Sequence, residues 1–188
     1  IVLADGSSSP SPLGLGPMPV ATQFDLSWTV SNQGQGSWSP VASLVSQGVG
    51  WTTSCTPVSP VQPSSSSIAW CSVIIPESQA GNAEVPLTLR LESEGLLAID
   101  TVSILVQETS KVSWTMQGNA PILKSGESTL ISLQVENQGN TQINTKIIVD
   151  TPTSGWAHQV SGSEILSLSP GESRTVAVSY THLRAHET

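Results

Sequence analysis

Apolar and polar residues alternate along two stretches that lie far apart in the chain. In both stretches every second side chain is large and apolar: Phe24, Leu26, Trp28 and Val30 in the first, and Ile131, Leu133 and Val135 in the second. A period of two is typical of a β-strand with one buried face. Each stretch runs into the tripeptide Asn-Gln-Gly, at residues 32–34 and 137–139. Asparagine can bond to its own backbone and glycine tolerates positive φ, so each tripeptide predicts a turn that ends the strand.

The two stretches belong to a longer internal repeat. Asn32 recurs as Asn137, and Trp51, which follows a glycine, recurs as Trp156, also after a glycine, so the offset is the same in both cases (137 − 32 = 156 − 51 = 105). Seven of the twenty-eight residues at 24–51 are identical in the second copy without any gap. A repeat of about 100 residues is the size of one Ig-like sandwich rather than of a solenoid unit. The sequence therefore predicts an all-β protein with two tandem Ig-like antiparallel β-sandwiches.

The repeat also predicts the domain boundaries. We expect an N-terminal strand and a Ser/Pro-rich linker over residues 1–19, a first sandwich over 20–107 and a second over 111–177. The N-terminal strand could belong to the first sandwich or to a preceding domain. A hairpin at 84–106 closes the first sandwich, with alternating apolar positions at Val85, Leu87, Leu89, Leu91, Val102, Ile104 and Val106.

The second copy stops before the equivalents of that hairpin. Its predicted strands lie near 128–136, 144–150, 156–160 and 173–177. We therefore expect the second sandwich to be truncated and to expose part of its core, with an unpaired edge that can recruit other strands.

The last eleven residues, 178–188, differ from the rest of the chain. They hold its only Tyr and two of its three His, and they break the alternation that Val176 and Val178 begin. The segment resembles the translation of a transposase sequencing adapter, so we interpret it as an adapter-derived artefact. The alternative is a genuine His-containing tail. Because the chain starts with Ile1 rather than Met, we also interpret it as an internal fragment of a longer protein.

The chain has two cysteines, and the repeat suggests that they pair. At the offset of 105, Cys55 falls on Val160 and Cys71 falls on Val176, so both cysteines are replaced together by residues that pack as a buried cross-strand pair. A Ser-rich chain of exported type also favours oxidised cysteines. We predict a Cys55–Cys71 disulfide; the alternative is two free, buried thiols.

The tryptophans are the candidate binding residues. Trp28 has the inward phase and is predicted to lie in the core, and Trp51 and Trp156 are interpreted as core or end-plugging residues, with ligand stacking as the alternative. Trp70 is adjacent to the inward Cys71, so it points to the outer face. With Trp38 it is the candidate surface for a carbohydrate or a partner protein, the alternative being a tryptophan covered by a loop or a neighbouring domain.

Composition excludes several classes of function. A net charge of −8 with 11% charged residues disfavours nucleic acid and anionic membrane surfaces as partners. The longest apolar runs are far shorter than a membrane-spanning helix. Outside 178–188 the only imidazole is His158, so we expect no catalytic residues, no metal site and no cofactor, and we interpret the chain as a non-enzyme.

A resemblance to a known group of domains rests on the second copy. Its features are Asn137-Gln138-Gly139-Asn140 between apolar strands, Pro152, Gly155-Trp156, and Leu168-Ser169-Pro170-Gly171-Glu172 before another strand. This pattern resembles the Ig-like accessory repeats of bacterial and archaeal surface proteins, including the cell-adhesion-related domain and the accessory domain associated with α-galactosidases. The first copy has Ser65-Ser66-Ser67 in place of the Pro-Gly-Glu turn.

The resemblance implies an extracellular or cell-surface location. It predicts a structural or adhesive spacer whose partners are neighbouring Ig-like repeats in the same chain. The alternative is an accessory module of a secreted hydrolase that binds a glycan or a surface protein. An exposed Trp70 and Trp38 would favour the alternative.

Overall fold

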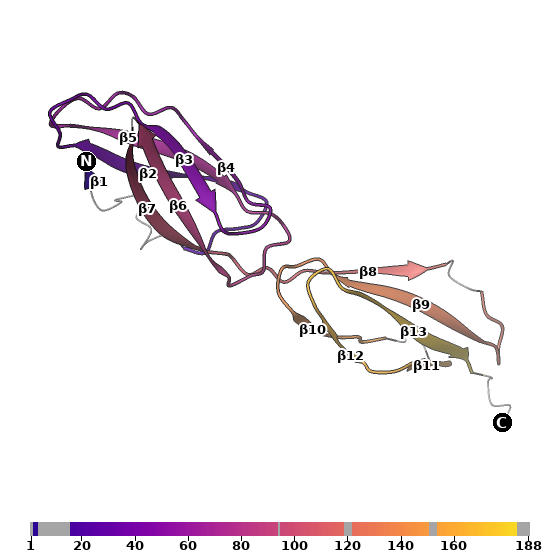
Figure 1. Ribbon diagram of the computed structural model, residues 1–188. Coiled ribbons are helices and arrows are strands. Elements are labelled where there is room, and N and C mark those ends of the chain that lie inside the picture. Colours follow the sequence, from indigo (N-terminus) through magenta and orange to yellow (C-terminus); the bar gives the residue numbers. More distant parts are fainter. Residues whose placement is uncertain (1, 4–15, 94, 119–121, 151–153, 184–188) are drawn as a thin grey trace. The chain divides into compact units, whose positions relative to one another are not determined.

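β-strands form all the regular structure that the computed structural model describes, which covers residues 2–3, 16–93, 95–118, 122–150 and 154–183 (Figure 1). The chain folds into two compact units, Ile1–Glu108 and Thr109–Thr188, called unit 1 and unit 2 below. The predicted all-β class is confirmed. The predicted linker falls mostly on residues 4–15, which lie outside the described residues.

Unit 1 consists of two antiparallel sheets. Its strands are β1 (Val2–Leu3), β2 (Gln23–Asn32), β3 (Val41–Ser46), β4 (Thr52–Cys55), β5 (Ser65–Ile74), β6 (Glu84–Ser93) and β7 (Leu96–Leu105). One sheet has the order β1-β2-β5-β4 and the other β3-β6-β7. β1 pairs with β2, with Val2 opposite Ser31, so the N-terminal strand belongs to unit 1.

The core of unit 1 lies between these sheets. Trp28 is only 1% exposed, which confirms its predicted place in the core, and its indole Nε1 donates a hydrogen bond of 2.9 Å to the Asp100 carboxylate. The alternation predicted for the closing hairpin is also confirmed, because all seven of its apolar positions are buried: Val85, Leu87, Leu89, Leu91, Val102, Ile104 and Val106. Apolar burial of this kind is the main favourable term in folding.

Unit 2 repeats the first sheet of unit 1 but has a smaller second sheet. Its strands are β8 (Val112–Gln117), β9 (Ser128–Asn137), β10 (Ile143–Lys146), β11 (Trp156–Val160), β12 (Ile165–Leu168) and β13 (Ser173–His182). The larger sheet has the order β11-β13-β9-β8, and β10 pairs with β12 alone. The strand predicted over 144–150 is therefore shorter than expected.

The last strand is longer than the predicted 173–177. β13 continues to His182 and pairs with β9 on one side and β11 on the other. Val178 is buried, and Tyr180 lines the same face as Val178, so the alternation does not break. The pattern was misread because tyrosine and histidine combine an apolar body with a polar tip. The hydrogen bonds between paired strands involve only backbone atoms, so many different sequences could form this pairing. The interpretation of 178–188 as adapter-derived therefore stays a prediction.

The register of β13 corrects the alignment of the two units. Val160 lies opposite Val178, as Cys55 lies opposite Cys71, whereas Val176 lies opposite Leu133. The offset is 105 up to Val160 and 107 in β13 (178 − 71 = 107), because two extra residues lie between the paired strands. The expectation that Val176 takes the place of Cys71 is therefore wrong. An ungapped alignment cannot detect a loop insertion.

Engineered cysteines test this register. We expect Val160→Cys with Val178→Cys to form a disulfide in unit 2, because the pair sits at a non-hydrogen-bonded position: the next pair carries the bond, from the Ser161 N–H to the Ala177 carbonyl at 2.8 Å. The control, Val160→Cys with Val176→Cys, should keep two free thiols. Peptide mapping by mass spectrometry distinguishes the two, and preferential bridging in the control variant would contradict the register.

Candidate functional site

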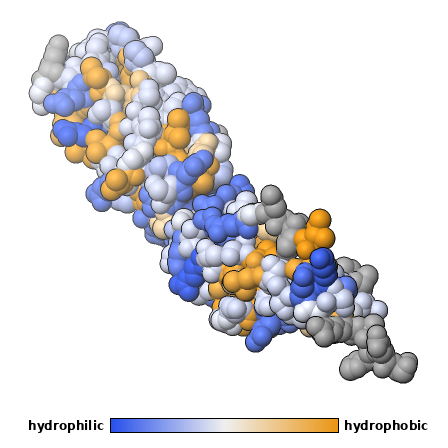
Figure 2. All heavy atoms as spheres, turned by 90° about the vertical axis from the view of Figure 1, so that its right-hand side faces the viewer, coloured by the Kyte–Doolittle hydropathy of each residue, from blue (hydrophilic) through white to orange (hydrophobic). Residues whose placement is uncertain are grey.

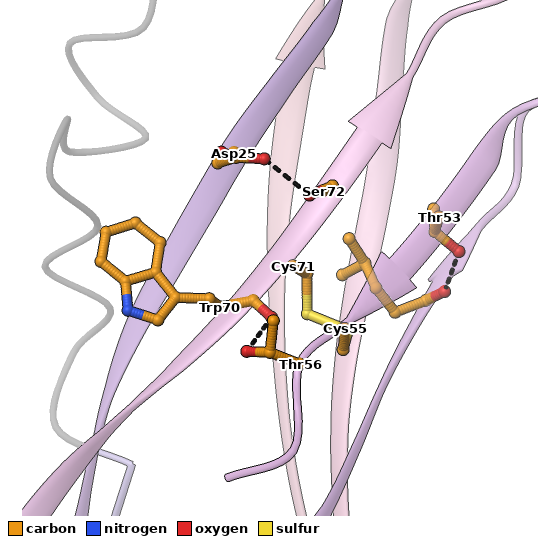
Figure 3. Close-up of a disulfide and its surroundings, with 8 residues drawn as sticks. Asp25, Thr53, Cys55, Thr56, Trp70, Cys71 and Ser72 are labelled. Atoms are coloured by element: carbon orange, nitrogen blue, oxygen red, sulfur yellow. Dashed lines mark hydrogen bonds between the residues drawn. A yellow bond between two sulfur atoms is a disulfide. The ribbon is translucent and has the colours of Figure 1, made fainter.

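The disulfide of unit 1 joins two neighbouring strands of one sheet. Cys55 of β4 and Cys71 of β5 are bonded, with an S–S distance of 2.05 Å, which confirms the predicted bridge (Figure 3). The pair is flanked by a hydrogen bond of 2.9 Å from the Thr56 N–H to the Trp70 carbonyl. Cys71 is buried in the core. The two cysteines are 16 residues apart, and closing a loop of this size lowers the entropy of the unfolded chain. In the chain-entropy model this stabilises the folded unit by about 3 kcal/mol.

Trp70 points away from the disulfide on the outer face of β5. Figure 3 shows its ring on the opposite side of the strand from Cys71, and the side chain is 44% exposed. Ile68 and Ile74 have the same phase on β5 and are also exposed. On the same face, the Ser72 hydroxyl donates a hydrogen bond of 2.7 Å to the Asp25 carboxylate. We call Ile68, Trp70 and Ile74 the outer apolar stripe.

Trp38 does not join this stripe. It is 4% exposed and packs in the core of unit 1, where its backbone forms two hydrogen bonds with Val61, of 3.0 and 2.7 Å. The prediction that Trp38 shares a surface with Trp70 is therefore wrong. Its counterpart at the offset of 105 is Ile143, which is also buried, and that apolar replacement was a usable signal for a core position.

The two repeated tryptophans lie at the ends of strands. Trp51 packs against the core of unit 1 and donates a hydrogen bond of 2.8 Å from its Nε1 to the Gln79 side chain, which confirms the end-plugging interpretation. Trp156 stacks on His182, with the ring centroids 4.7 Å apart.

Each unit has a buried asparagine at the end of its central strand. The sequence predicts only a turn at these two positions and not a buried side chain. Asn32 is 2% exposed and Asn137 is 0% exposed. The side-chain amide of Asn32 donates to the carbonyls of Gly36 (2.7 Å) and Val61 (2.8 Å). That of Asn137 donates to the carbonyls of Thr141 (2.8 Å) and Leu168 (3.0 Å).

The side-chain oxygen of each asparagine forms the predicted turn. The Gly34 N–H donates to the Asn32 side-chain oxygen at 2.9 Å, and the Gly139 N–H donates to that of Asn137 at the same distance. Each asparagine therefore uses its donors and its acceptor at once, as a buried amide should. The sequence predicts this turn from the local bond of the asparagine, but it does not predict that the amide is buried.

The backbone carbonyl of each asparagine binds a second turn, just before β5 or β13. The Ser64 N–H donates to the Asn32 carbonyl at 2.8 Å, and the Gly171 N–H donates to the Asn137 carbonyl at 2.9 Å. Ser64 and Gly171 both have positive φ, 56° and 71°. The counterpart of Pro170-Gly171-Glu172 is therefore Pro63-Ser64-Ser65, at the offset of 107, and not Ser65-Ser66-Ser67.

A carboxylate reinforces this turn in unit 2. The pKa of Glu172 is lowered, first by the hydrogen bond of 2.9 Å that the Ser169 N–H donates to it and then by the side chain of Arg174, 2.8 Å away. The ionised carboxylate therefore favours the folded turn above the ordinary glutamate pKa, and this contribution is lost as the pH falls through the lowered pKa.

The described residues offer neither a metal site nor a membrane-spanning helix. No group of three or more His, Cys, Asp or Glu side chains is arranged to hold a metal ion there. Within the same residues, no helix has the length and apolarity to span a membrane.

Comparison with known proteins leaves the family open. No protein-family model matches the chain, and no curated protein matches it. A solved structure of a protein of unknown function from Porphyromonas gingivalis W83 is similar over 88% of this chain and 78% of that one, at 16% identity and a TM-score of 0.34. A likeness this weak supports no argument about fold or function.

Unit 2 has an open apolar groove. It has a volume of about 470 Å³ and runs over the inward face of β8, β9 and β13, with Ile131, Leu133 and Val135 of β9 in its lining. Trp114 of β8 also lines it and is 69% exposed. Hydrophobic side chains at the surface are visible in Figure 2.

Substitution of the buried asparagine tests its role. Asn32→Asp keeps the turn-forming oxygen but removes the donors to Gly36 and Val61, so we expect unit 1 to lose about 3 kcal/mol of unfolding free energy, as in Asn32→Ala. The measurement is urea unfolding followed by tryptophan fluorescence, with the exposed Gln33→Ala as the control. If Asn32 served only as a turn residue, aspartate would be tolerated, because it suits that position equally well.

Proposed function

We propose that the chain consists of two tandem Ig-like sandwiches and acts as a non-catalytic structural or adhesive spacer in a large secreted or cell-surface protein. The strand order β1-β2-β5-β4 with a second sheet β3-β6-β7 supports this proposal, because a constant-type Ig sandwich has the same order of seven strands. In unit 2 the order β8-β9-β13-β11 follows the same plan for the first sheet.

The observation that carries the proposal is the duplicated asparagine network. Asn32 and Asn137 bind equivalent backbone groups at nearly the same distances, although most of the surrounding residues differ. The two units therefore share the hydrogen bonds that fix their backbone turns. A repeated spacer requires such a shared, stable backbone.

The disulfide supports the proposed extracellular or cell-surface location. Disulfides persist in oxidising compartments and are rare in reducing ones. The Cys55–Cys71 bridge is therefore compatible with an extracellular or surface-exposed unit 1, where neighbouring repeats of the same chain would be the main partners.

The uninterrupted gene around this sequence tests the spacer proposal. We expect long-read sequencing of the source to find further repeats with the Asn-Gln-Gly tripeptide after a strand of period two, together with an export signal and an anchor. A hydrolase domain beside these two units, with no further repeats, would contradict the proposal.

One observation favours a second function. The outer apolar stripe places an exposed indole between two exposed isoleucines on β5, and exposed tryptophan is a common platform for stacking on sugars or partner side chains. The second candidate is therefore a carbohydrate- or protein-binding accessory module of a secreted hydrolase, with Trp70 at its centre.

A glycan array distinguishes the two candidates. As a spacer, the chain should bind no glycan above background, and Trp70→Ala should change neither this result nor the melting temperature by more than the control Ile99→Ala, which alters another exposed position of unit 1. Glycan binding that Trp70→Ala abolishes and Ile99→Ala preserves would establish the accessory module instead.

A further inference from the structure

The inward face of the larger sheet is covered in unit 1 and open in unit 2. In unit 1, Trp28 of β2 is fully buried, with β6 and β7 supplying buried residues to the same core. Its counterpart at the offset of 105 is Leu133, which is only half-buried and lines the apolar groove. The open area of unit 2 therefore corresponds to the area that β6 and β7 close in unit 1.

The residues after β10 keep the alternating exposure of a strand. Over residues 143–150, side chains alternate between inward, more buried positions and exposed ones, and the inward Ile147 and Val149 line the groove. In unit 1 the counterparts are Ala42 and Leu44 of β3, which pair with Leu91 and Leu89 of β6. The sequence of unit 2 thus retains the inward pattern that would face such a partner.

Backbone direction shows which edge is available. Ile143 pairs with Leu168 of β12, and the Ile147 N–H donates to the Glu164 carbonyl at 2.8 Å, so this set of backbone groups faces β12. Alternate residues of a strand direct their backbone groups to opposite edges. Lys146 therefore faces the other edge, and if the alternation continues past β10 the backbone groups of Ile148 and Asp150 face it too. No strand pairs with this edge in the described part of unit 2.

We propose that this edge and the apolar groove together form a docking site for one β-hairpin of the β6–β7 type, joined to β13 in the same polypeptide. Unit 1 carries the argument for that occupant, because there β6 follows β5 along the chain, pairs with β3 and buries Leu87, Leu89 and Leu91. Its first strand would add to the Lys146–Asp150 edge by backbone bonds, and its apolar positions would fill the groove.

The β6–β7 hairpin of unit 1 is a suitable probe for this docking site, because its register and one of its charges match the open edge of unit 2. Val41 pairs with Glu92, so the same register places Glu92 of an added hairpin opposite Lys146. Opposite charges at facing positions stabilise a strand pair. The inference concerns how unit 2 is completed and does not depend on the proposed spacer role.

A fusion protein tests the proposal. His182 corresponds to Ile75 (182 − 75 = 107), so a second copy of residues 76–106 replaces residues 183–188 after His182, and the rest of the chain is unchanged. A reporter thiol is placed in the groove by Leu133→Cys, and a control thiol on the outer face by Thr175→Cys. We expect modification of the groove thiol to slow roughly tenfold or more in the fusion, because the hairpin shields it, while the control thiol reacts at an unchanged rate.

Amide exchange identifies the mode of docking. In the fusion, the amide protons of Lys146, Ile148 and Asp150 should exchange more slowly than in the unextended chain, since a strand pairs with them. A matched fusion whose added hairpin carries aspartate in place of Leu87 and Leu89 should restore fast labelling and fast exchange. Its own unit 1 remains unaltered and reports that the protein is folded.

Three results would overturn the proposal. The first is a groove thiol that reacts equally fast with and without the hairpin. The second is protection by the aspartate-bearing hairpin, which would indicate non-specific covering. The third is a groove thiol that is already protected in the unextended chain in a concentration-dependent manner, because a second copy of the chain would then be the occupant.

Discussion

The buried asparagine at the end of the central strand is the interaction on which both units depend. Asn32 and Asn137 each connect three places along the chain: their own turn, the segment four residues on, and the turn before the partner strand. A buried amide that lost its partners would cost about 1–3 kcal/mol per unpaired group, so its geometry is strongly specified. The surrounding apolar residues can vary in size as long as these bonds remain.

This constraint explains why two units with few identities have the same first sheet. In unit 1 it is combined with a disulfide and with a second sheet of three strands, and the core is closed. In unit 2 a valine pair replaces the disulfide and the second sheet has two strands, so the core stays open. A scaffold fixed at the turns is well suited to a repeated spacer, because the remaining surface is free to change.

Local patterns in the sequence predicted the parts of the fold that depend on neighbouring residues. The period of two in β2, β6 and β7 identified the buried face. The predicted Cys55–Cys71 disulfide is present, although the Val160–Val176 pair that supported it is not a cross-strand pair. The register of β13 could not be predicted, because two inserted residues between Val160 and Val178 move every later position. The burial of Trp38 was not predicted, since a lone aromatic residue has no pattern around it. The burial of Asn32 could not be predicted either, because it depends on Val61, which is distant in the sequence.

Hydrogen exchange of the side-chain amides, followed by NMR, tests the central role of the two asparagines most directly. The amide protons of Asn32 and Asn137 should exchange far more slowly than those of the neighbouring, exposed Gln33 and Gln138, and only as fast as the backbone of their own unit opens. Exchange of either asparagine at the rate of its exposed neighbour would contradict the account, since that side chain could not then be holding the turns together.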